Sequence, residues 1–393
     1  MDISRRGFLL GGAAAVGAAG CCGLFGASKP CRYSVSILGD IHFDSTDTRH
    51  YHSDYTHSTT KARYEGHLKE HVRNAGMWAD RMPRLVAASA KCVAHDAAFA
   101  FQMGDLVQGD CGNRDTHRRM LDDAFGLLKK SYGSLPVVVV PGNHDIRGDI
   151  EGDGAKETLE KWIPRRMSRE LGVEVAGTTF LFWHGPDAYI VVDFNKPDNP
   201  DFAQLMGLLK RSEGARHTFI LSHGPVIPSC TSRWFLLGEK DRTEERRELR
   251  AALAKRGAIA LSGHTHVLEH YECVFPEGRI SQFVFNSVWS RPGAEDMALD
   301  GKGTHDAYAI RARSIRNYTP PSVSPKKAAR WTDLAELSDE YSPFVKESLA
   351  VSTVGHYRMN VSDDSVTVDF FAGDSTSPKR RFELLAGRRG GMI

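Results

Sequence analysis

Apolar residues along this chain are gathered into short runs that are separated by longer, mixed segments. Five runs have the length of a β-strand: 35–38, 97–101, 137–140, 218–221 and 258–261. Uninterrupted apolar runs of this length are typical of strands buried on both faces. Segments with apolar residues at helical spacing lie between them: 81–94, 116–131 and 243–255. Strands alternating with helices predict an α/β fold in which helices cover a sheet.

Side chains that can bind a metal follow each of the five apolar runs. They are Asp40 with His42, Asp105, Asn143, His223, and His264 with His266. Taken singly, each has a simpler interpretation, as a turn carboxylate or as a buried histidine bonded to a carbonyl group. Their repeated position favours one shared site, because ligands of α/β sheets lie beyond the carboxyl ends of the strands.

The turn after the valine run has three successive side chains that can bind an ion or transfer a proton. It reads Pro141-Gly142-Asn143-His144-Asp145, and its proline and glycine end the strand. An amide, an imidazole and a carboxylate in one tight turn suit the handling of an ion and a proton, although Asn and Asp also favour turns for local reasons.

In chain order, Asp-x-His, Gly-Asp, Gly-Asn-His-Asp, a lone His-Gly and Gly-His-Thr-His resemble the motifs of the calcineurin-like metallophosphoesterases. The resemblance spans Val35 to His266. It implies a four-layer αββα sandwich, with two mixed β-sheets flanked by helices and a dinuclear metal site above the strand ends.

The resemblance also implies a role for each residue. One metal ion would be held by Asp40, His42 and His266, and the second by Asn143, His223 and His264. Asp105 would bridge both ions, and His144 would face the substrate without binding metal.

These ligand types make chemical sense by themselves. Carboxylate, amide and imidazole ligands without thiolate suit divalent Mn, Fe or Zn. Two such ions about 3.5–4 Å apart can clamp the attacking and leaving oxygens of a phosphoryl displacement and lower the pKa of a bridging water. His144 would then act as general acid toward the leaving alkoxide. Asp145 would hold an amide of the glycine turn or tune the imidazole, with a purely structural role as the alternative.

Gln108 occupies a position at which related phosphatase families carry different residues. Three residues after the bridging aspartate, purple acid phosphatases place a tyrosine ligand, and serine/threonine phosphatases place an aspartate that orients the catalytic histidine. Glutamine supplies no phenolate, so we expect a protein without charge-transfer colour. The amide oxygen of Gln108 is expected to hydrogen-bond His144.

Several segments lie outside the motifs. Residues 44–76 are polar and carry five histidines, namely His50, His52, His57, His67 and His71. This insertion is either a loop over the metal site that brings His50 or His52 to the phosphate, or a solvated excursion. Residues 147–156 are expected to form a loop at the edge of the site. Trp183 and His184 are expected either to form part of the wall of the substrate site or to pack against neighbouring side chains.

The C-terminal third contains a second insertion at 290–347, interpreted as a surface excursion with Trp331 and Tyr341 as anchors. Alternation over 357–361 and 365–371, around a polar turn, predicts a hairpin, which we place in the second sheet. The basic tail 376–393 is expected to fray. These features predict one domain over residues 31–375.

The first 30 residues are interpreted as a targeting segment. Ser4-Arg5-Arg6 and the apolar, Ala/Gly-rich run after it resemble a twin-arginine export signal, with an ordinary signal as the alternative. Cys21 is a candidate lipidation site, so the only expected membrane association is through a lipid anchor. We expect a periplasmic or other extracytoplasmic location.

Composition and net charge restrict the possible functions. The 393 residues are 41% hydrophobic and 25% charged with a net charge of +2, which is typical of a soluble globular protein and gives no bulk signal for nucleic-acid binding. The sequence therefore predicts hydrolysis of a small phosphate mono- or diester. The alternatives are a nuclease or cyclic-nucleotide phosphodiesterase on the same scaffold, and a binding module without catalysis. Nothing in the sequence indicates the oligomeric state.

Overall fold

The computed structural model describes residues 32–53, 61–147, 154–195, 200–228, 235–299 and 334–384. Their strands form two sheets. The first sheet has the order β13-β12-β11-β1-β2-β3. Its strands are β1 (Tyr33–Leu38), β2 (Ala97–Gln102), β3 (Val137–Val139), β11 (Gly355–Val361), β12 (Val366–Ala372) and β13 (Arg380–Leu384).

The second sheet has the order β10-β8-β9-β7-β6-β5-β4. Its strands are β4 (Phe180–His184), β5 (Asp187–Val192), β6 (Thr218–Ser222), β7 (Ile259–Ser262), β8 (Leu268–Phe275), β9 (Gly278–Val284) and β10 (Val345–Val351). Both sheets mix parallel and antiparallel pairs, for example β1 parallel to β2 and antiparallel to β11.

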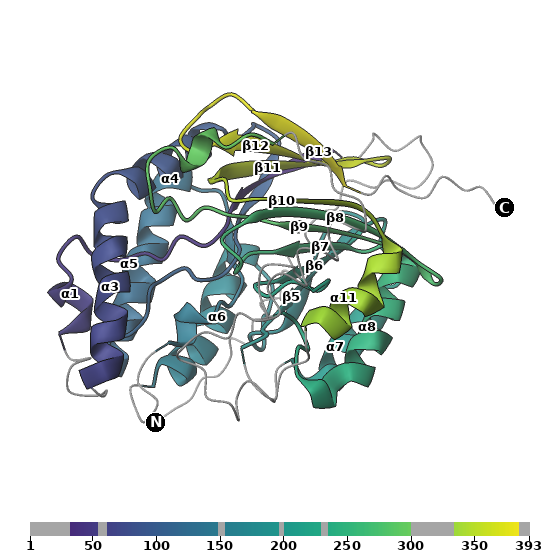
Figure 1. The fold of residues 1–393 in the computed structure, drawn as a ribbon, viewed down its shortest axis with the longest axis horizontal. Coiled ribbons are helices and arrows are strands. Elements are labelled where there is room, and N and C mark those ends of the chain that lie inside the picture. The colour runs from purple at the N-terminus through teal and green to yellow at the C-terminus, as the bar shows by residue number, and fades with distance from the viewer. Residues whose placement is uncertain are drawn as a thin grey trace, which may run out of the picture.

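Helices cover the outer faces of the two sheets, so the predicted α/β sandwich is confirmed (Figure 1). The helices on the side of the first sheet are α1 (Arg49–His52), α3 (Lys61–Trp78), α4 (Arg81–Lys91), α5 (Arg114–Tyr132) and α6 (Ala155–Leu171). Those on the side of the second sheet are α7 (Phe202–Arg211), α8 (Thr243–Arg256) and α11 (Leu334–Tyr341). Short 3-10 turns complete the chain: η1 (His144–Ile146), η2 (Lys240–Arg242), η3 (Ala294–Asp296) and η4 (Ser342–Phe344).

Local signals in the sequence explain where the predicted helices begin and end. The side chain of Asn113 caps α5 by accepting from the backbone N–H of Thr116 at 2.8 Å. Gly257 ends α8 with a φ of 61°, a conformation that favours glycine. The apolar residues expected on one face of α5, among them Leu121 and Phe125, are buried.

The described part of the insertion 44–76 is mostly helical, which neither interpretation of it anticipated. Residues 61–76 belong to α3, which packs beside α4. Its apolar positions are few and are interrupted by histidines and charges, so the sequence pattern does not show the helix. In the second insertion, Tyr341 is buried against Phe275 as expected of an anchor.

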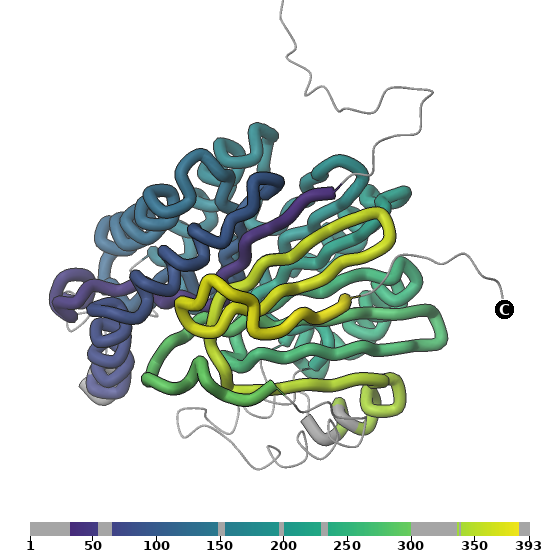
Figure 2. The backbone as a smooth tube through the Cα atoms, turned by 90° about the horizontal axis from the view of Figure 1, so that it is seen from above, coloured from purple at the N-terminus to yellow at the C-terminus, as the bar shows by residue number. Residues whose placement is uncertain are grey.

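The predicted hairpin is present as β11 and β12, but its placement in the second sheet is wrong. Tyr33 and Ile37 of β1 pair with Val361 and Tyr357 of β11, so the hairpin extends the first sheet (Figure 2). Residues 380–384, expected to fray with the tail, form β13 beside β12. Alternation identifies strands but not their partners, because pairing depends on contacts far apart in sequence.

Some expectations fall on residues that the structure does not describe. They are the targeting segment 1–30 with Cys21, His57, Trp331, residues 148–153 of the loop expected at 147–156, and the last residues of the tail. Within the described residues, no helix combines the length and the apolar character needed to cross a membrane.

Aromatic rings fill the space between the two sheets. Tyr189 of β5 stacks on Phe219 of β6 at 4.5 Å and meets Phe99 and Phe101 of β2 at 5.5 and 5.6 Å between ring centroids. His184 lies edge-on to Phe99 at 5.0 Å, whereas Trp183 is 45% exposed. The position of His184 therefore agrees with packing.

A polar contact joins the two sheets within this apolar layer. The hydroxyl of Tyr33, on β1, donates to Oδ2 of Asp187, on β5, at 2.7 Å and also meets the hydroxyl of Tyr189. Both oxygens of Asp187 accept from the guanidinium of Arg216, at 2.9 and 2.5 Å. The buried carboxylate is therefore satisfied from both sheets.

Removal of the Asp187 carboxylate should destabilise the protein strongly. We expect Asp187→Ala to lower the free energy of unfolding by about 3–5 kcal/mol, because it leaves the guanidinium of Arg216 without its buried partner. The matched control is Asp363→Ala, since Asp363 pairs with the same Arg216 but is 46% exposed; its expected effect is below about 1 kcal/mol. Urea unfolding measures both variants, and equal effects would contradict this assignment.

Candidate metal centre

The polar residues predicted at strand ends meet at one edge of the sandwich. Asp40 and His42 follow β1, and Asp105 follows β2, both in the first sheet. His223 follows β6, and His264 and His266 follow β7, both in the second sheet. The site is therefore built from the carboxyl ends of strands in both sheets.

Two groups of these residues are close enough to hold a metal ion each. Their members are Asp40, His42, Asp105 and His266 in the first group, and Asp105, His223 and His264 in the second. Within each group, one ligand atom per residue lies within 4.8 Å of all the others. Asp105 belongs to both groups.

In the first group, the imidazoles face a carboxylate and each other. Nε2 of His266 lies 3.1 Å from Oδ2 of Asp40 and 3.0 Å from Nε2 of His42. Nε2 of His42 lies 3.8 Å from Oδ2 of Asp105. These separations bring lone pairs toward one point, as a cation requires.

The second group converges on the same carboxylate oxygen. Nε2 of His223 lies 3.1 Å from Oδ2 of Asp105, and Nδ1 of His264 lies 3.3 Å from Nε2 of His223. Oδ2 of Asp105 thus faces imidazoles of both groups, which is the geometry that a bridging ligand needs.

Hydrogen bonds from the surrounding backbone orient these side chains. Nδ1 of His223 donates to the carbonyl of Met103 at 2.7 Å, so Nε2 is the nitrogen directed at the cluster. Oδ1 of Asp105 accepts from the backbone N–H of His144 at 2.7 Å. The carboxylate of Asp40 accepts from the backbone N–H of His264 at 3.0 Å.

The backbone is strained at several of these positions. His42, Asp105, His264 and His266 have φ values of 42°, 51°, 73° and 53°, which residues with a side chain rarely adopt. Strain of this kind clusters at functional sites. The strained turns aim the side chains into the cluster.

Glycine is required where the strand ends approach each other. A Cβ at Gly142 would lie 1.9 Å from the backbone nitrogen of Asp105, and a Cβ at Gly104, with a φ of 93°, would lie 2.3 Å from Nδ1 of His223. The glycines of the Gly-Asp and Gly-Asn-His-Asp motifs thus allow Asp105 and His223 to reach their places.

Without a metal, protons distribute unevenly over the cluster. Burial lowers the pKa of His42 to about 4, and burial with the charge on His223 lowers the pKa of His264 to about 3. Burial opposes protonation of His223, but the charges of Asp105 and Asp40 raise its pKa to about 10.

Both carboxylates are ionised. Burial would raise the pKa of Asp40 and of Asp105. The charge on His223, together with hydrogen bonds from His266 to Asp40 and from His223 to Asp105, outweighs burial, so both pKa values lie below the usual value, that of Asp105 well below. Two carboxylates with one imidazolium and at least two neutral imidazoles make a site that attracts cations.

Asn143 also agrees with bound metal. Oδ1 of Asn143 is buried without a hydrogen-bond partner in the described part of the chain, so it has a lone pair available for a cation. Asn143 precedes His144, whose N–H holds Asp105. Oxygen and nitrogen donors without thiolate fit divalent first-row ions.

His144 lies beside the first group. Its ring meets that of His42 edge-on at 4.5 Å, its Nδ1 donates to the backbone carbonyl of Gln108 at 3.0 Å, and its Nε2 accepts from Arg147 at 3.1 Å. Burial lowers the pKa of His144 well below its usual value; the charge of Asp105 opposes this shift and that of Arg147 adds to it.

The expected hydrogen bond from the Gln108 side chain to His144 is wrong. The amide oxygen of Gln108 accepts from Nδ2 of Asn74 at 2.5 Å, and its amide nitrogen donates to Glu70 at 3.2 Å. The side chain turns toward α3, the helix that the sequence pattern did not reveal, and only the backbone carbonyl of Gln108 contacts His144.

Asp145 supports the turn rather than the imidazole. Its Oδ1 accepts from the N–H of Val107 at 3.0 Å and its Oδ2 from the N–H of Gly142 at 2.8 Å, which confirms the expected hold on a glycine-turn amide. Burial and the charge of Asp105 raise the pKa of Asp145 to about 8.

The histidines of the first insertion that the structure describes do not join either group. His50 is exposed and packs edge-on against Tyr51. His52 is buried, where its Nε2 donates to Asp44 and its Nδ1 to the carbonyl of Asp110, each at 3.0 Å. It stacks on His71 at 3.7 Å between ring centroids.

Arg147 is the residue that sequence reasoning missed. Its guanidinium pairs with Glu70 at 2.8 Å and with Asp110 at 3.0 Å while it contacts His144. Asp110 also accepts from His71 at 3.3 Å. The available signal was the position of Arg147, three residues after His144 and so within one helical turn, but the segment was interpreted as a loop.

The sequence matches the family model described as calcineurin-like phosphoesterase over residues 33–268. The chain belongs to the calcineurin-like phosphoesterase family. The matched range contains both ligand groups, so this family of metallophosphoesterases accounts for the motifs at all five strand ends. No curated protein sequence matches the chain.

Several solved structures are similar to this chain. The purple acid phosphatase PPD1 from yellow lupin seeds has 10% identity and a TM-score of 0.48, and the alignment covers 90% of this chain and 54% of the lupin enzyme. A dimetal phosphatase from Danio rerio has 12% identity, coverage of 90% and 98%, and a TM-score of 0.47. GAP50, the anchor in the inner membrane complex of Plasmodium, has 12% identity, coverage of 92% and 90%, and a TM-score of 0.43.

This chain thus spans about half the length of the lupin enzyme. At these identities and TM-scores, the likeness transfers neither an activity nor a substrate. The metal-ligating geometry described above comes from this chain alone.

Substitution of Gly142, the residue before Asn143, should disturb the metal-ligand cluster although Gly142 is not itself a ligand. We expect Gly142→Ala to lower metal content and the thermal midpoint, because its methyl group collides with the backbone of Asp105. The control is Gly126→Ala in α5, where a Cβ meets nothing within 4 Å; it should stabilise by about 0.5–1 kcal/mol. Metal analysis and thermal unfolding report the two effects. Unchanged metal content in Gly142→Ala would contradict the close packing described here.

Proposed function

We propose that the protein is a dinuclear metal-dependent phosphoesterase that hydrolyses small phosphate mono- or diesters. The observation that carries this proposal is the position of Asp105, whose Oδ2 faces imidazoles of two separate ligand groups. A single structural cation would not need a carboxylate shared by two groups. Membership of the calcineurin-like phosphoesterase family supports the same conclusion.

The proposed ligand assignment follows the two groups. Asp40, His42 and His266 hold one divalent ion, His223, His264 and Asn143 hold the other, and Asp105 bridges them. Two divalent ions held in this way supply positive charge and an activated water for in-line phosphoryl displacement. Mn, Fe and Zn all suit these donors.

His144 and Arg147 complete the proposed site. His144 lies beside the first group, and its role as general acid requires the protonated ring. In that form Nδ1–H stays on the carbonyl of Gln108, and the proton on Nε2, which replaces the hydrogen bond from Arg147, passes to the leaving alkoxide of a bound ester. The ion pairs of Arg147 with Glu70 and Asp110 fix the guanidinium next to this ring. Arg147 therefore acts as a positioning residue for His144.

The first test is metal content together with hydrolysis of an aryl phosphate. Purified protein is expected to carry close to two transition-metal ions per chain and to be active with Mn, Fe or Zn. Asp105→Asn should lose both ions and activity, because the bridge serves both. The control is Asp115→Asn, an exposed position on α5 that should keep both. Full metal content in Asp105→Asn would remove Asp105 from the bridge.

His144→Ala tests the proton donor. We expect turnover to fall by about 10²–10⁴-fold while metal content stays near that of the wild type. The loss should be smaller for an aryl ester with a good leaving group than for an alkyl ester, because a good leaving group needs little protonation. Equal losses for both esters would show that His144 positions the phosphate instead.

We further propose that residues 1–30 are a twin-arginine export signal ahead of a single domain that begins at residue 31, and that the protein acts outside the cytoplasm. The pattern Ser4-Arg5-Arg6-Gly7-Phe8-Leu9 supports this. Replacement of Arg5 and Arg6 by lysine should retain the protein in the cytoplasm, and continued export would favour an ordinary signal. Cys21→Ala should release the protein from membranes if Cys21 carries a lipid.

A further inference from the structure

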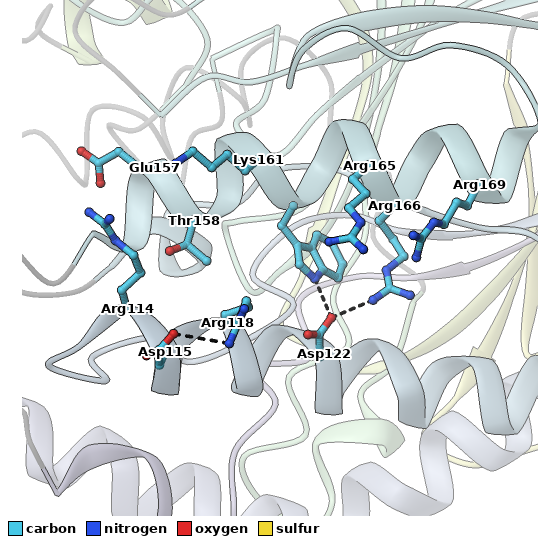
Figure 3. Close-up of a pocket in the computed structure, with 11 residues that line it drawn as sticks. Arg114, Asp115, Arg118, Asp122, Glu157, Thr158, Lys161, Arg165, Arg166 and Arg169 are labelled. Carbon is cyan, nitrogen blue, oxygen red and sulfur yellow. Dashed lines mark hydrogen bonds and ion pairs between the residues drawn. The ribbon is translucent and has the colours of Figure 1, made fainter.

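A groove of about 350 Å³ lies between α5 and α6 on the outer side of the first sheet. Side chains from both helices line it (Figure 3). The lining residues are Arg114, Asp115, Arg118, Asp122, Glu157, Thr158, Lys161, Trp162, Arg165, Arg166 and Arg169. None of them belongs to either candidate ligand group, so the groove is separate from the metal centre.

Positive charge dominates this groove. Six of its side chains are cationic and three are acidic, and two of the acids are already paired: Asp115 with Arg118 at 3.3 Å, and Asp122 with Arg166 at 2.7 Å. Among the described residues, no carboxylate lies within ion-pair distance of the remaining four cations. These are Arg114, Lys161, Arg165 and Arg169.

The cations are arranged in rows at helical spacing. Lys161, Arg165 and Arg169 follow one another at intervals of four residues on α6, and Arg114 and Arg118 do so on α5. Four residues correspond to about 6 Å along a helix. Like charges at this spacing repel each other and destabilise a helix. An anion between the rows would relieve that repulsion.

Two of the arginines have close neighbours in the structure. Arg166 stacks on Phe125 at 4.7 Å and on Trp162 at 5.4 Å while it pairs with Asp122. Arg114 lies against Gly154, where an added Cβ would come within 2.2 Å of its Nε. The contacts of Arg166 restrain its guanidinium, and a cation restrained in this way loses less conformational freedom when it binds a ligand.

The side-chain chemistry favours phosphate groups. Five of the six cations are arginines, whose planar guanidinium binds phosphate through two parallel hydrogen bonds. Trp162, the aromatic residue in the lining, is only 7% exposed and hydrogen-bonds Asp122, so it offers no free face on which a nucleotide base could stack. Rows of charge without a stacking surface fit a chain of phosphates better than a nucleic acid.

We propose that the groove between α5 and α6 binds an oligophosphate anion, a ligand with two or more linked phosphate groups. This site is independent of the proposed hydrolysis at the metal centre. Along the chain, α5 follows the segment that carries Asp105, and α6 follows the segment that carries His144.

The experiment is calorimetric titration of the full-length, metal-loaded protein with inorganic tripolyphosphate, with orthophosphate for comparison. The groove variant is Arg165→Gln/Arg169→Gln. Its matched control is Arg211→Gln/Lys255→Gln, which removes the same charge from exposed positions on α7 and α8. All four positions are exposed, so thermal midpoints should stay at the wild-type value.

Tripolyphosphate should bind the wild type more tightly than orthophosphate does. Its affinity should fall about tenfold or more in the groove variant, and less than about twofold in the control. A third variant, Asp105→Asn, should bind tripolyphosphate as the wild type does, which separates the groove from anion binding or metal loss at the metal centre.

Three results would overturn the proposal. They are absence of binding to the wild type, equal weakening in the groove variant and its control, and loss of binding in Asp105→Asn but not in the groove variant. Tighter binding of a single-stranded oligonucleotide than of tripolyphosphate, lost in the groove variant, would assign the groove to nucleic acid instead.

Discussion

The candidate site depends on how one carboxylate is held. Oδ1 of Asp105 accepts from the backbone N–H of His144, so only Oδ2 remains for the imidazoles of the two ligand groups. That arrangement requires a left-handed backbone at Asp105 and a glycine at 142, which lets the turn after β3 approach the turn after β2. Backbone strain and the burial of charge are both unfavourable, and a bound cation offsets the second.

Residues around the two ligand groups support this arrangement without being metal ligands themselves. Asp145 ties the amides of Val107 and Gly142 together, and Met103 orients His223 from the strand-end turn after β2. On the other side of His144, Arg147 connects the ring to Glu70 of α3 and to Asp110. The helix α3 therefore belongs to the support of the site, although it contributes none of the grouped ligand residues.

Sequence reasoning could predict the parts of the molecule that depend on local pattern. Apolar runs located the strands that carry the site, and the polar residues directly after them proved to be neighbours in space. It could not predict that the amide of Gln108 turns to Asn74, because that contact requires knowledge of α3, whose apolar positions are sparse. It also misplaced the hairpin at 357–371, since the alternation of β11 and β12 is equally compatible with either sheet.

The assembly of the site from both sheets has a consequence for folding. Asp40, His42 and Asp105 come from the ends of β1 and β2, whereas His223, His264 and His266 come more than one hundred residues later, from the second sheet. A cation that is held between them joins the two halves of the sandwich as a cross-link does, and its binding free energy adds to the free energy of folding. Metal occupancy and the docking of one sheet on the other are thus thermodynamically linked, and each should report on the other.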